Sequence, residues 1–428
     1  MEERPLQIEL IVLLVMIGSF LIANMLLKLP VSLSMMLGAV LGTLVGGEGI
    51  PLRHLFEGAF VYLDTMMIIA TAMIFMNVIE KSGTIEALGA AIVRRFYKVP
   101  AVMLILLMLI IMFPGMITGS STAAVLSAGA IVAPILMLMG IPASKTGAML
   151  AIGAILGMAA PPVNIPAMLI TGGVDMPYIG FALPLLALTL PCAVFTALLL
   201  GLPYCKNLDY EKVKTGLNLE VGSRHGFKLY LPIVTLFLLM ILTRAFAAYI
   251  PNLGMPLIFL ISSVVGFFTG EKLDVVKTVE TSISTSVPVL AKLVGVGMFI
   301  QIMTLTGARG FIVINCLGLG IVMLWIFSIT ILPAFGAVSS FGGASVLGVP
   351  FMLSMLSGNH TITAAALAFL ACMGDLMPPT ALAGNYAAKI VEQRYAKVLP
   401  RCLIPLAFCL LLGLLFLIFS KNLGFLVL

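Results

Sequence analysis

Small hydroxyl residues interrupt two long apolar stretches at matching places in the chain. The first break reads Gly119-Ser-Ser-Thr122, and the second contains Ser339-Ser340, with Ser120 and Ser339 offset by 219 residues. A helix that starts after such a break presents free N–H groups suited to a carboxylate, while the free carbonyls before it suit a small cation. Matched breaks in two halves of a membrane chain indicate a solute site, although small residues also let helices pack closely.

Tandem prolines follow each break after a further apolar run. Pro161-Pro162 and Pro378-Pro379 are offset by 217 residues. Proline lacks the amide donor and clashes with the preceding turn, so each pair is expected to break a long span and free backbone carbonyls. Asn164 and Thr380 lie just beyond, where their side-chain oxygens could complete an oxygen shell.

Asp375 is the sharpest single candidate. It stands three positions before Pro378 in an otherwise apolar span, and an acid inside a membrane is costly enough to indicate function. It could bind a cation or a proton, or pair with Lys292, which falls within another apolar span. The competing interpretation is a shorter span in which a cavity hydrates Asp375.

Composition places the chain in the membrane. It is 61% hydrophobic and 9% charged over 428 residues, with a mean hydropathy of +1.22, which excludes ordinary soluble proteins. We therefore expect the chain to be embedded in a lipid bilayer. No HExxH, Walker or Rossmann pattern occurs, so neither an enzyme nor an ATP-driven pump is expected. The +6 net charge sits in loops and does not indicate nucleic acid, and the scattered cysteines support neither disulfides nor zinc.

Apolar segments of spanning length recur along the whole chain. We expect spans near 6–27, 30–46, 62–80, 146–172, 178–202, 229–248, 256–269, 283–304, 361–386 and 402–420. The stretches 100–140 and 317–357 carry the Ser-Ser breaks at mid-length. Each is predicted to be a re-entrant hairpin, because broken backbone at membrane depth needs a protein or polar surrounding.

The distribution of basic residues predicts the topology. With returning hairpins and the first residue outside, seventeen Lys and Arg residues fall inside and five outside, with Lys292 within a span. This obeys the positive-inside rule. Both termini are therefore predicted to be extracytoplasmic and the polar linker 203–228 cytoplasmic. The first span is taken as a retained helix and not a signal peptide.

The two hairpins then open from opposite sides, which is an inverted repeat. The predicted fold class is an all-α polytopic membrane protein with inverted-topology repeats, each holding a re-entrant helical hairpin and a Pro-Pro-broken transmembrane helix. We expect N-terminal scaffold helices and an interfacial segment over 1–60, a first inverted repeat over 61–202, the linker 203–228, and a second half with scaffold helices and repeat over 229–428. The segment 1–60 shows no evident site character.

The motifs together resemble a known family. Gly119-Ser-Ser-Thr122, the run Ala160-Pro-Pro-Val-Asn164 and the later Met377-Pro-Pro379 are similar to those of the large membrane subunit of TRAP transporters, within the ion transporter superfamily. This resemblance implies an elevator-type secondary carrier in which Na⁺ drives uptake of a small organic anion. It also implies two partners, a four-helix small membrane subunit and an extracytoplasmic solute-binding protein.

The resemblance further implies two cation sites. One would hold Na⁺ at Ser120, Ser121, Pro161 and Asn164, and its inverted counterpart at Ser339, Ser340, Pro378 and Thr380, with Asp375 added to the second. Solute contacts are assigned to Thr122, Ser345 and Asn385. The expected function is thus sodium-coupled transport of a carboxylate in a bacterial or archaeal inner membrane. The alternative is a proton-coupled carrier or cation antiporter of the same superfamily without a binding protein.

Overall fold

The computed structural model describes residues 7–205, 226–246, 249, 251 and 253–427. Within these ranges the chain is helical, with no strand, which confirms an all-α polytopic membrane protein. Eight of the described helical segments are long and apolar enough to cross a membrane. The α-helices are α1 (Gln7–Met25), α2 (Val31–Val45), α3 (Leu52–Phe60), α4 (Leu63–Lys81), α5 (Thr84–Phe96), α6 (Pro100–Thr118), α7 (Ser121–Ala124), α8 (Ala130–Leu138), α9 (Ala143–Ala159), α10 (Ile165–Gly173), α11 (Ala182–Gly201), α14 (Leu231–Ala245), α15 (Gly254–Thr269), α16 (Val275–Leu305), α17 (Ala308–Leu317), α18 (Ile321–Gly336), α19 (Ser340–Gly343), α20 (Val349–Ser354), α21 (His360–Met373), α22 (Leu382–Ile390) and α23 (Tyr395–Ile418).

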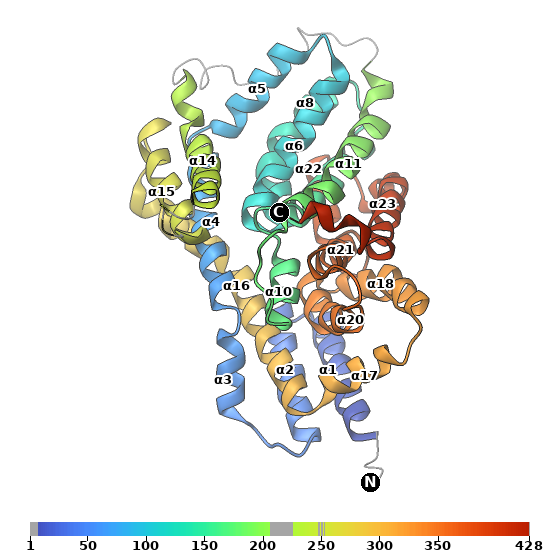
Figure 1. Cartoon of the computed structure of the whole chain (residues 1–428). Coiled ribbons are helices and arrows are strands. Elements are labelled where there is room, and N and C mark those ends of the chain that lie inside the picture. The colour runs from blue at the N-terminus through green and yellow to red at the C-terminus, as the bar shows by residue number, and fades with distance from the viewer. Residues whose placement is uncertain (1–6, 206–225, 247–248, 250, 252, 428) are drawn as a thin grey trace.

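Two halves of the chain repeat the same order of elements. In each, a long helix is followed by a short helix, a hairpin, a broken span and a last long helix, so that α4–α11 correspond to α16–α23. Figure 1 shows the short helices α5 and α17 at opposite ends of the molecule. The fold thus has the predicted inverted-topology repeats.

The two hairpins have matching tips. Hairpin 1 comprises α6–α8 and hairpin 2 comprises α18–α20. The Ser120 hydroxyl accepts a hydrogen bond from the backbone amide of Ala123 at 3.3 Å, and the Ser339 hydroxyl accepts one from the backbone amide of Gly342 at 3.1 Å. A serine before the first turn satisfies an otherwise free amide, and this explains why the returning helix starts there. A π-helical turn follows in each, η1 (Val125–Gly129) and η4 (Ala344–Gly348).

The Pro-Pro breaks are joined to the hairpins by backbone hydrogen bonds. Both Pro-Pro bonds are cis. The amide of Val163 donates to the Met116 carbonyl at 3.1 Å, and the amide of Thr380 donates to the Ala337 carbonyl at 3.4 Å. Each break therefore lies directly against the C-terminal end of the first helix of its own hairpin.

Glycine allows each broken span to approach its hairpin closely. A Cβ on Gly157 would lie 2.3 Å from the Met112 carbonyl oxygen, and one on Gly374 would lie 2.4 Å from that of Pro333. These two glycines stand four residues before their Pro-Pro pairs. Backbone thus packs on backbone at the same place in both halves.

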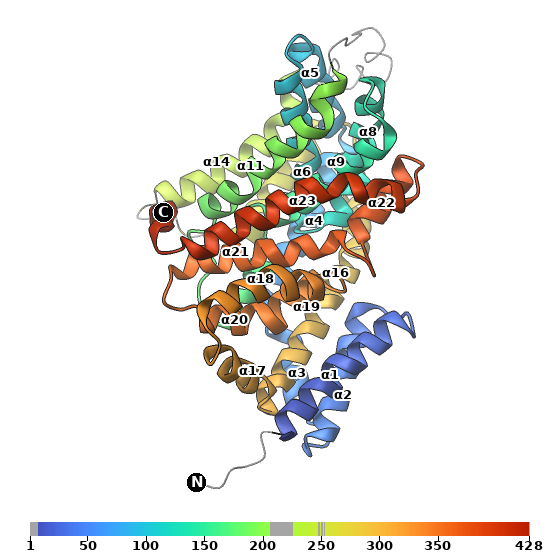
Figure 2. The ribbon, with the colours of Figure 1, turned by 90° about the vertical axis from the view of Figure 1, so that its right-hand side faces the viewer.

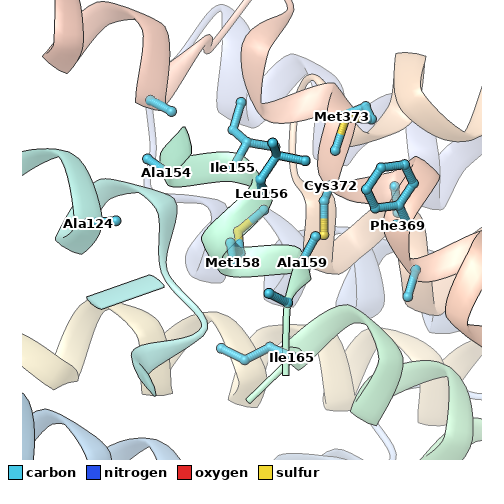
Figure 3. Close-up of a cluster of buried hydrophobic side chains, with 14 of the residues drawn as sticks. Ala124, Ala154, Ile155, Leu156, Met158, Ala159, Ile165, Phe369, Cys372 and Met373 are labelled. Atoms are coloured by element: carbon cyan, nitrogen blue, oxygen red, sulfur yellow. The ribbon is translucent and has the colours of Figure 1, made fainter. Parts of the chain in front are cut away.

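The core lies between the two broken spans. Figure 3 shows Ile155, Leu156 and Met158 of α9 near Phe369 and Cys372 of α21, all of them buried. Because the first helices of both broken spans share one apolar core, their Pro-Pro ends are brought into the same region of the molecule.

A second group of helices flanks this core. The helices α1 and α2 pair at one end of the molecule and contact α16, while α14 and α15 pair beside α4 (Figures 1 and 2). The ring of Phe20 on α1 stacks on Phe335 of hairpin 2, with centroids 5.9 Å apart. The guanidinium of Arg309 on α17 donates to the Gly173 carbonyl at the end of α10. The flanking helices thus touch the hairpin region at a few defined points.

Candidate functional site

A cavity of about 510 Å³ lies where the two hairpin tips meet. The first tip contributes Ser120, Ser121 and Thr122, and the second contributes Ser339 and Ser340. Asp375 and Thr380 from the second broken span complete this wall. Both hairpin tips and the second broken span therefore line one cavity.

The two halves are linked inside this cavity by one short hydrogen bond. The Ser121 hydroxyl donates to Oδ2 of Asp375 at 2.6 Å, across 254 residues of sequence. The Ser340 hydroxyl lies close to this carboxylate. The three side chains are only 2–6% exposed. A carboxylate with two hydroxyls in a confined space forms an oxygen-rich pocket, of the kind that binds a proton or a small cation.

Lys292 of α16 also lines this cavity. Its ammonium interacts electrostatically with Asp375, yet the pair is not within the 4.0 Å of an ion pair. The nitrogen lies 5.8 Å from the centre of the Phe341 ring. The cavity is therefore lined by one acid and one base that are not in direct contact.

A second cavity of about 580 Å³ adjoins the first. The two share Ser120, Thr122, Pro288, Val289, Lys292 and Leu382 as lining residues. The second extends past Met73 and Met76 to Glu80, which is exposed at the end of α4. The hairpin tips are thus connected to the protein surface by a passage with a largely apolar wall.

Five of the predicted site residues do not line either cavity. They are Pro161, Asn164, Ser345, Pro378 and Asn385. The amide of Asn164 is bonded at both ends, to the Ala159 carbonyl at 2.7 Å and to the Ala167 amide at 2.9 Å. The Ser345 hydroxyl returns to its own helix at Phe341. These side chains brace the backbone of the breaks and tips.

Pro378 and Asn385 also lie away from the cavity. Pro378 has no donor to offer and is exposed at the break. The Asn385 amide donates to the Thr380 carbonyl at 2.9 Å, and the residue is exposed. The oxygen-rich pocket around Asp375 therefore draws on both tips, and the two separate cation sites expected from the sequence stay predictions.

The first helices contribute residues that the sequence did not indicate. Asn24, Pro30, Val31 and Ser32, at the turn between α1 and α2, line the first cavity. This differs from the expectation that 1–60 has no site character. The nearby polar residues were not recognised because nothing in their spacing shows that α1 and α2 lean on α16.

A further hollow lacks the chemistry of a solute site. It has about 680 Å³, lies on the apolar face of α11 and is lined by six apolar side chains, as expected of a surface that lipid covers. Among the described residues no three of His, Cys, Asp or Glu lie together as a metal cluster.

Comparison with known proteins supports a transporter fold. No protein-family model matches the chain, and no curated protein matches it in sequence. Among solved structures, the YdaH transporter of Alcanivorax borkumensis is 16% identical with a TM-score of 0.62, covering 87% of this chain and 89% of its own. MtrF of Neisseria gonorrhoeae, described within a class of antimetabolite efflux pumps, is also 16% identical with a TM-score of 0.62, covering 95% and 97%.

These matches correct the predicted function and partners. The matched structures are described as the YdaH transporter and as MtrF of a class of antimetabolite efflux pumps, and neither as a subunit of a TRAP system. The prediction of a TRAP large subunit in a sodium-coupled organic-anion uptake system is therefore wrong, and so are its two partner proteins. The Ser-Ser and Pro-Pro motifs misled because they specify broken helices, which are shared well beyond TRAP systems.

Both matched structures are transporters and not enzymes, in agreement with the expectation from the sequence. The apolar helices and these matches establish a multi-pass membrane protein. The chain has the helical fold of a membrane transporter, built from two inverted halves that meet at Ser121 and Asp375.

Proposed function

We propose that this chain works alone as a secondary exporter of a small solute, with the two joined cavities as the solute path. The observation that carries the proposal is the meeting of both hairpin tips at Asp375, where one hydrogen bond joins the halves inside a cavity. Export is the direction suggested by the description of MtrF as an antimetabolite efflux pump. The sequence contains no nucleotide-binding motif through which ATP could drive the export, and we therefore propose secondary transport.

The proposal assigns different tasks to the cavity residues. Ser121, Ser340 and Asp375 hold the driving cation, since they supply the carboxylate and two hydroxyl oxygens. Thr122 contacts the solute, because it lines both cavities. Ser120 and Ser339 hold the tips in shape through their amide contacts.

The moving and fixed parts follow from the packing. We assign hairpins 1 and 2 with α9–α11 and α21–α23 to the moving part, because they share the core around the broken spans. The flanking helices α1–α4 and α14–α16 form the fixed part. We assign both termini to the outside of a prokaryotic cell membrane, which the basic residues of the loops favour, and with this orientation the passage beside Glu80 opens to the cytoplasm.

The test is export by the chain alone. Cells lacking their own efflux pumps would express the chain and be challenged with a panel of antimetabolites. The compound against which it protects best would then be radiolabelled, and its uptake into inverted vesicles measured. We expect protection without any partner protein, and its loss in S121A and D375N. S345A is the matched control, because it removes a buried hydroxyl outside the cavity. Transport that survives in D375N refutes the assignment of the site.

A further inference from the structure

Two opposite charges from different parts of the fold border the same cavity. Asp375 follows α21 within the proposed moving part, and Lys292 lies on α16 among the flanking helices. Asp375 is 6% exposed, and Lys292 is only partly exposed. Burying even one of these groups is costly unless a counter-charge is near. The pair therefore needs an explanation beyond packing.

Asp375 is the carboxylate with which Lys292 interacts. The other ionisable groups around them are Glu80 on α4 and Tyr386 on α22, which line the adjoining cavity, and Cys372, which lies beside Asp375 on α21. Glu80 is exposed at the far end of that cavity. The ammonium thus has one nearby negative charge, and that charge is the one which a driving cation would need.

The geometry leaves room for exchange. Lys292 and Asp375 are not in contact as an ion pair, and the ammonium is also held beside the Phe341 ring, at 5.8 Å from its centre. Oδ2 of Asp375 accepts a hydrogen bond from Ser121 instead of one from the lysine. A long lysine stem can carry its charge over several ångströms by rotamer changes alone. The ammonium can therefore approach or leave the carboxylate while the backbone stays in place.

We propose that Lys292 is the internal counter-ion of Asp375, which neutralises the carboxylate when the driving cation has left and is displaced when that cation binds. This inference rests on the cation site of the proposed function. One carboxylate cannot compensate two positive charges in a confined space, so lysine and cation compete for it. In this arrangement of the two parts, Asp375 is then neutralised either by the cation or by Lys292, whose helix α16 belongs to the fixed part.

The competition is measured on purified full-length protein through its unfolding temperature. Two series are recorded, one with rising Na⁺ at constant ionic strength with choline, and one with pH at constant salt. Ligands that bind only the folded state raise the unfolding temperature, so each series reports cation affinity without requiring the solute. Wild type, K292M, K292R, D375N and the control K421M are compared.

In K292M we expect the half-saturating Na⁺ concentration to fall at least about tenfold, or the midpoint of the pH series to rise by about one unit, because the competing charge is gone. K292R keeps that charge and is expected to respond as the wild type, and so is K421M, whose lysine lies at the distant end of α23. An unchanged or weaker cation response in K292M overturns the counter-ion role. If K292M does not fold, K292R decides the matter, because it keeps the positive charge. A cation response in K292R that is shifted as far as loss of the charge should shift it would also refute the counter-ion role.

The outcomes separate this inference from the proposed function. If D375N abolishes the response while K292M leaves it unchanged, the cation site stands and only the role of Lys292 fails. If D375N retains the full response, the cation binds elsewhere, and both assignments fall. Export without any cation response removes the counter-ion role but leaves the solute path intact.

Discussion

Replacing Gly374 with alanine tests whether the close approach of backbones positions the acid. An added Cβ would lie 2.4 Å from the carbonyl carbon of Gly336, 2.4 Å from the Pro333 oxygen and 2.6 Å from the Ala337 nitrogen. Non-bonded carbons prefer about 3.5–4.0 Å, so α18 and α21 must separate by roughly 1 Å. All three neighbours are backbone atoms, and therefore no side chain can rotate away to relieve the contact.

The expected cost follows from these distances. Overpacking of this kind destabilises by about 1–3 kcal/mol. The functional loss should be larger, because Asp375 is the next residue and its bond from Ser121 is 2.6 Å long. A displacement of roughly 1 Å takes that pair past the limit of a useful hydrogen bond. G374A is thus expected to fold with a lower unfolding temperature and to lose most export.

Two other glycines serve as controls in the same assays, thermal unfolding of purified protein and export from cells. G157A meets the Met112 carbonyl oxygen at 2.3 Å, so it should lose similar stability, but no acid follows it. G310A has nothing within 4 Å of the added methyl and should match the wild type. If G374A behaves like G310A in both assays, the helices separate freely and the reasoning from packing is refuted.

Three further predictions concern stability and topology. N164A should lower the free energy of unfolding by about 1–3 kcal/mol, because it removes a cap and a buried hydrogen bond; thermal unfolding checks this, and an unchanged midpoint contradicts the bracing role. R309Q should lose about 1–3 kcal/mol of stability, because it removes the hydrogen bond to the Gly173 carbonyl, whereas R53Q, on an exposed side chain, should leave the unfolding midpoint unchanged; equal effects in both argue against the contact. In intact cells a membrane-impermeant maleimide should label K421C but not K98C, and the reverse pattern inverts the assigned orientation.

The sequence predicted the broken elements well, because breaks are encoded locally. A serine cap and a proline pair act on the residues next to them, so the starts of α7 and α19 and the ends of α9 and α21 agree with the positions expected. The short helices α5 and α17 were not recognised, because neither reaches the length of a span. The span near 283–304 begins earlier, at Val275, since the Asp274 carboxylate caps the helix there by accepting the amide hydrogen bond of Lys277.

The partner of Asp375 could not be predicted from the sequence. Matching offsets grouped Ser121 with Asn164 in the first half and placed Asp375 with the second. In the structure the hydroxyl crosses to the other half, while Asn164 is used to cap α10. Such a contact depends on how the two broken spans share a core, and that packing leaves no periodic trace in either segment.

The span of 254 residues between Ser121 and Asp375 also bears on biogenesis. Ribosomes add about 5–20 residues per second, so the tip of hairpin 1 emerges roughly 13–50 s before its acidic partner exists. During that interval the nascent membrane segment has an open polar tip with no partner from the second half. Insertion of this chain therefore depends on something, whether water, lipid headgroups or the insertion machinery, to shield that tip until translation is nearly complete.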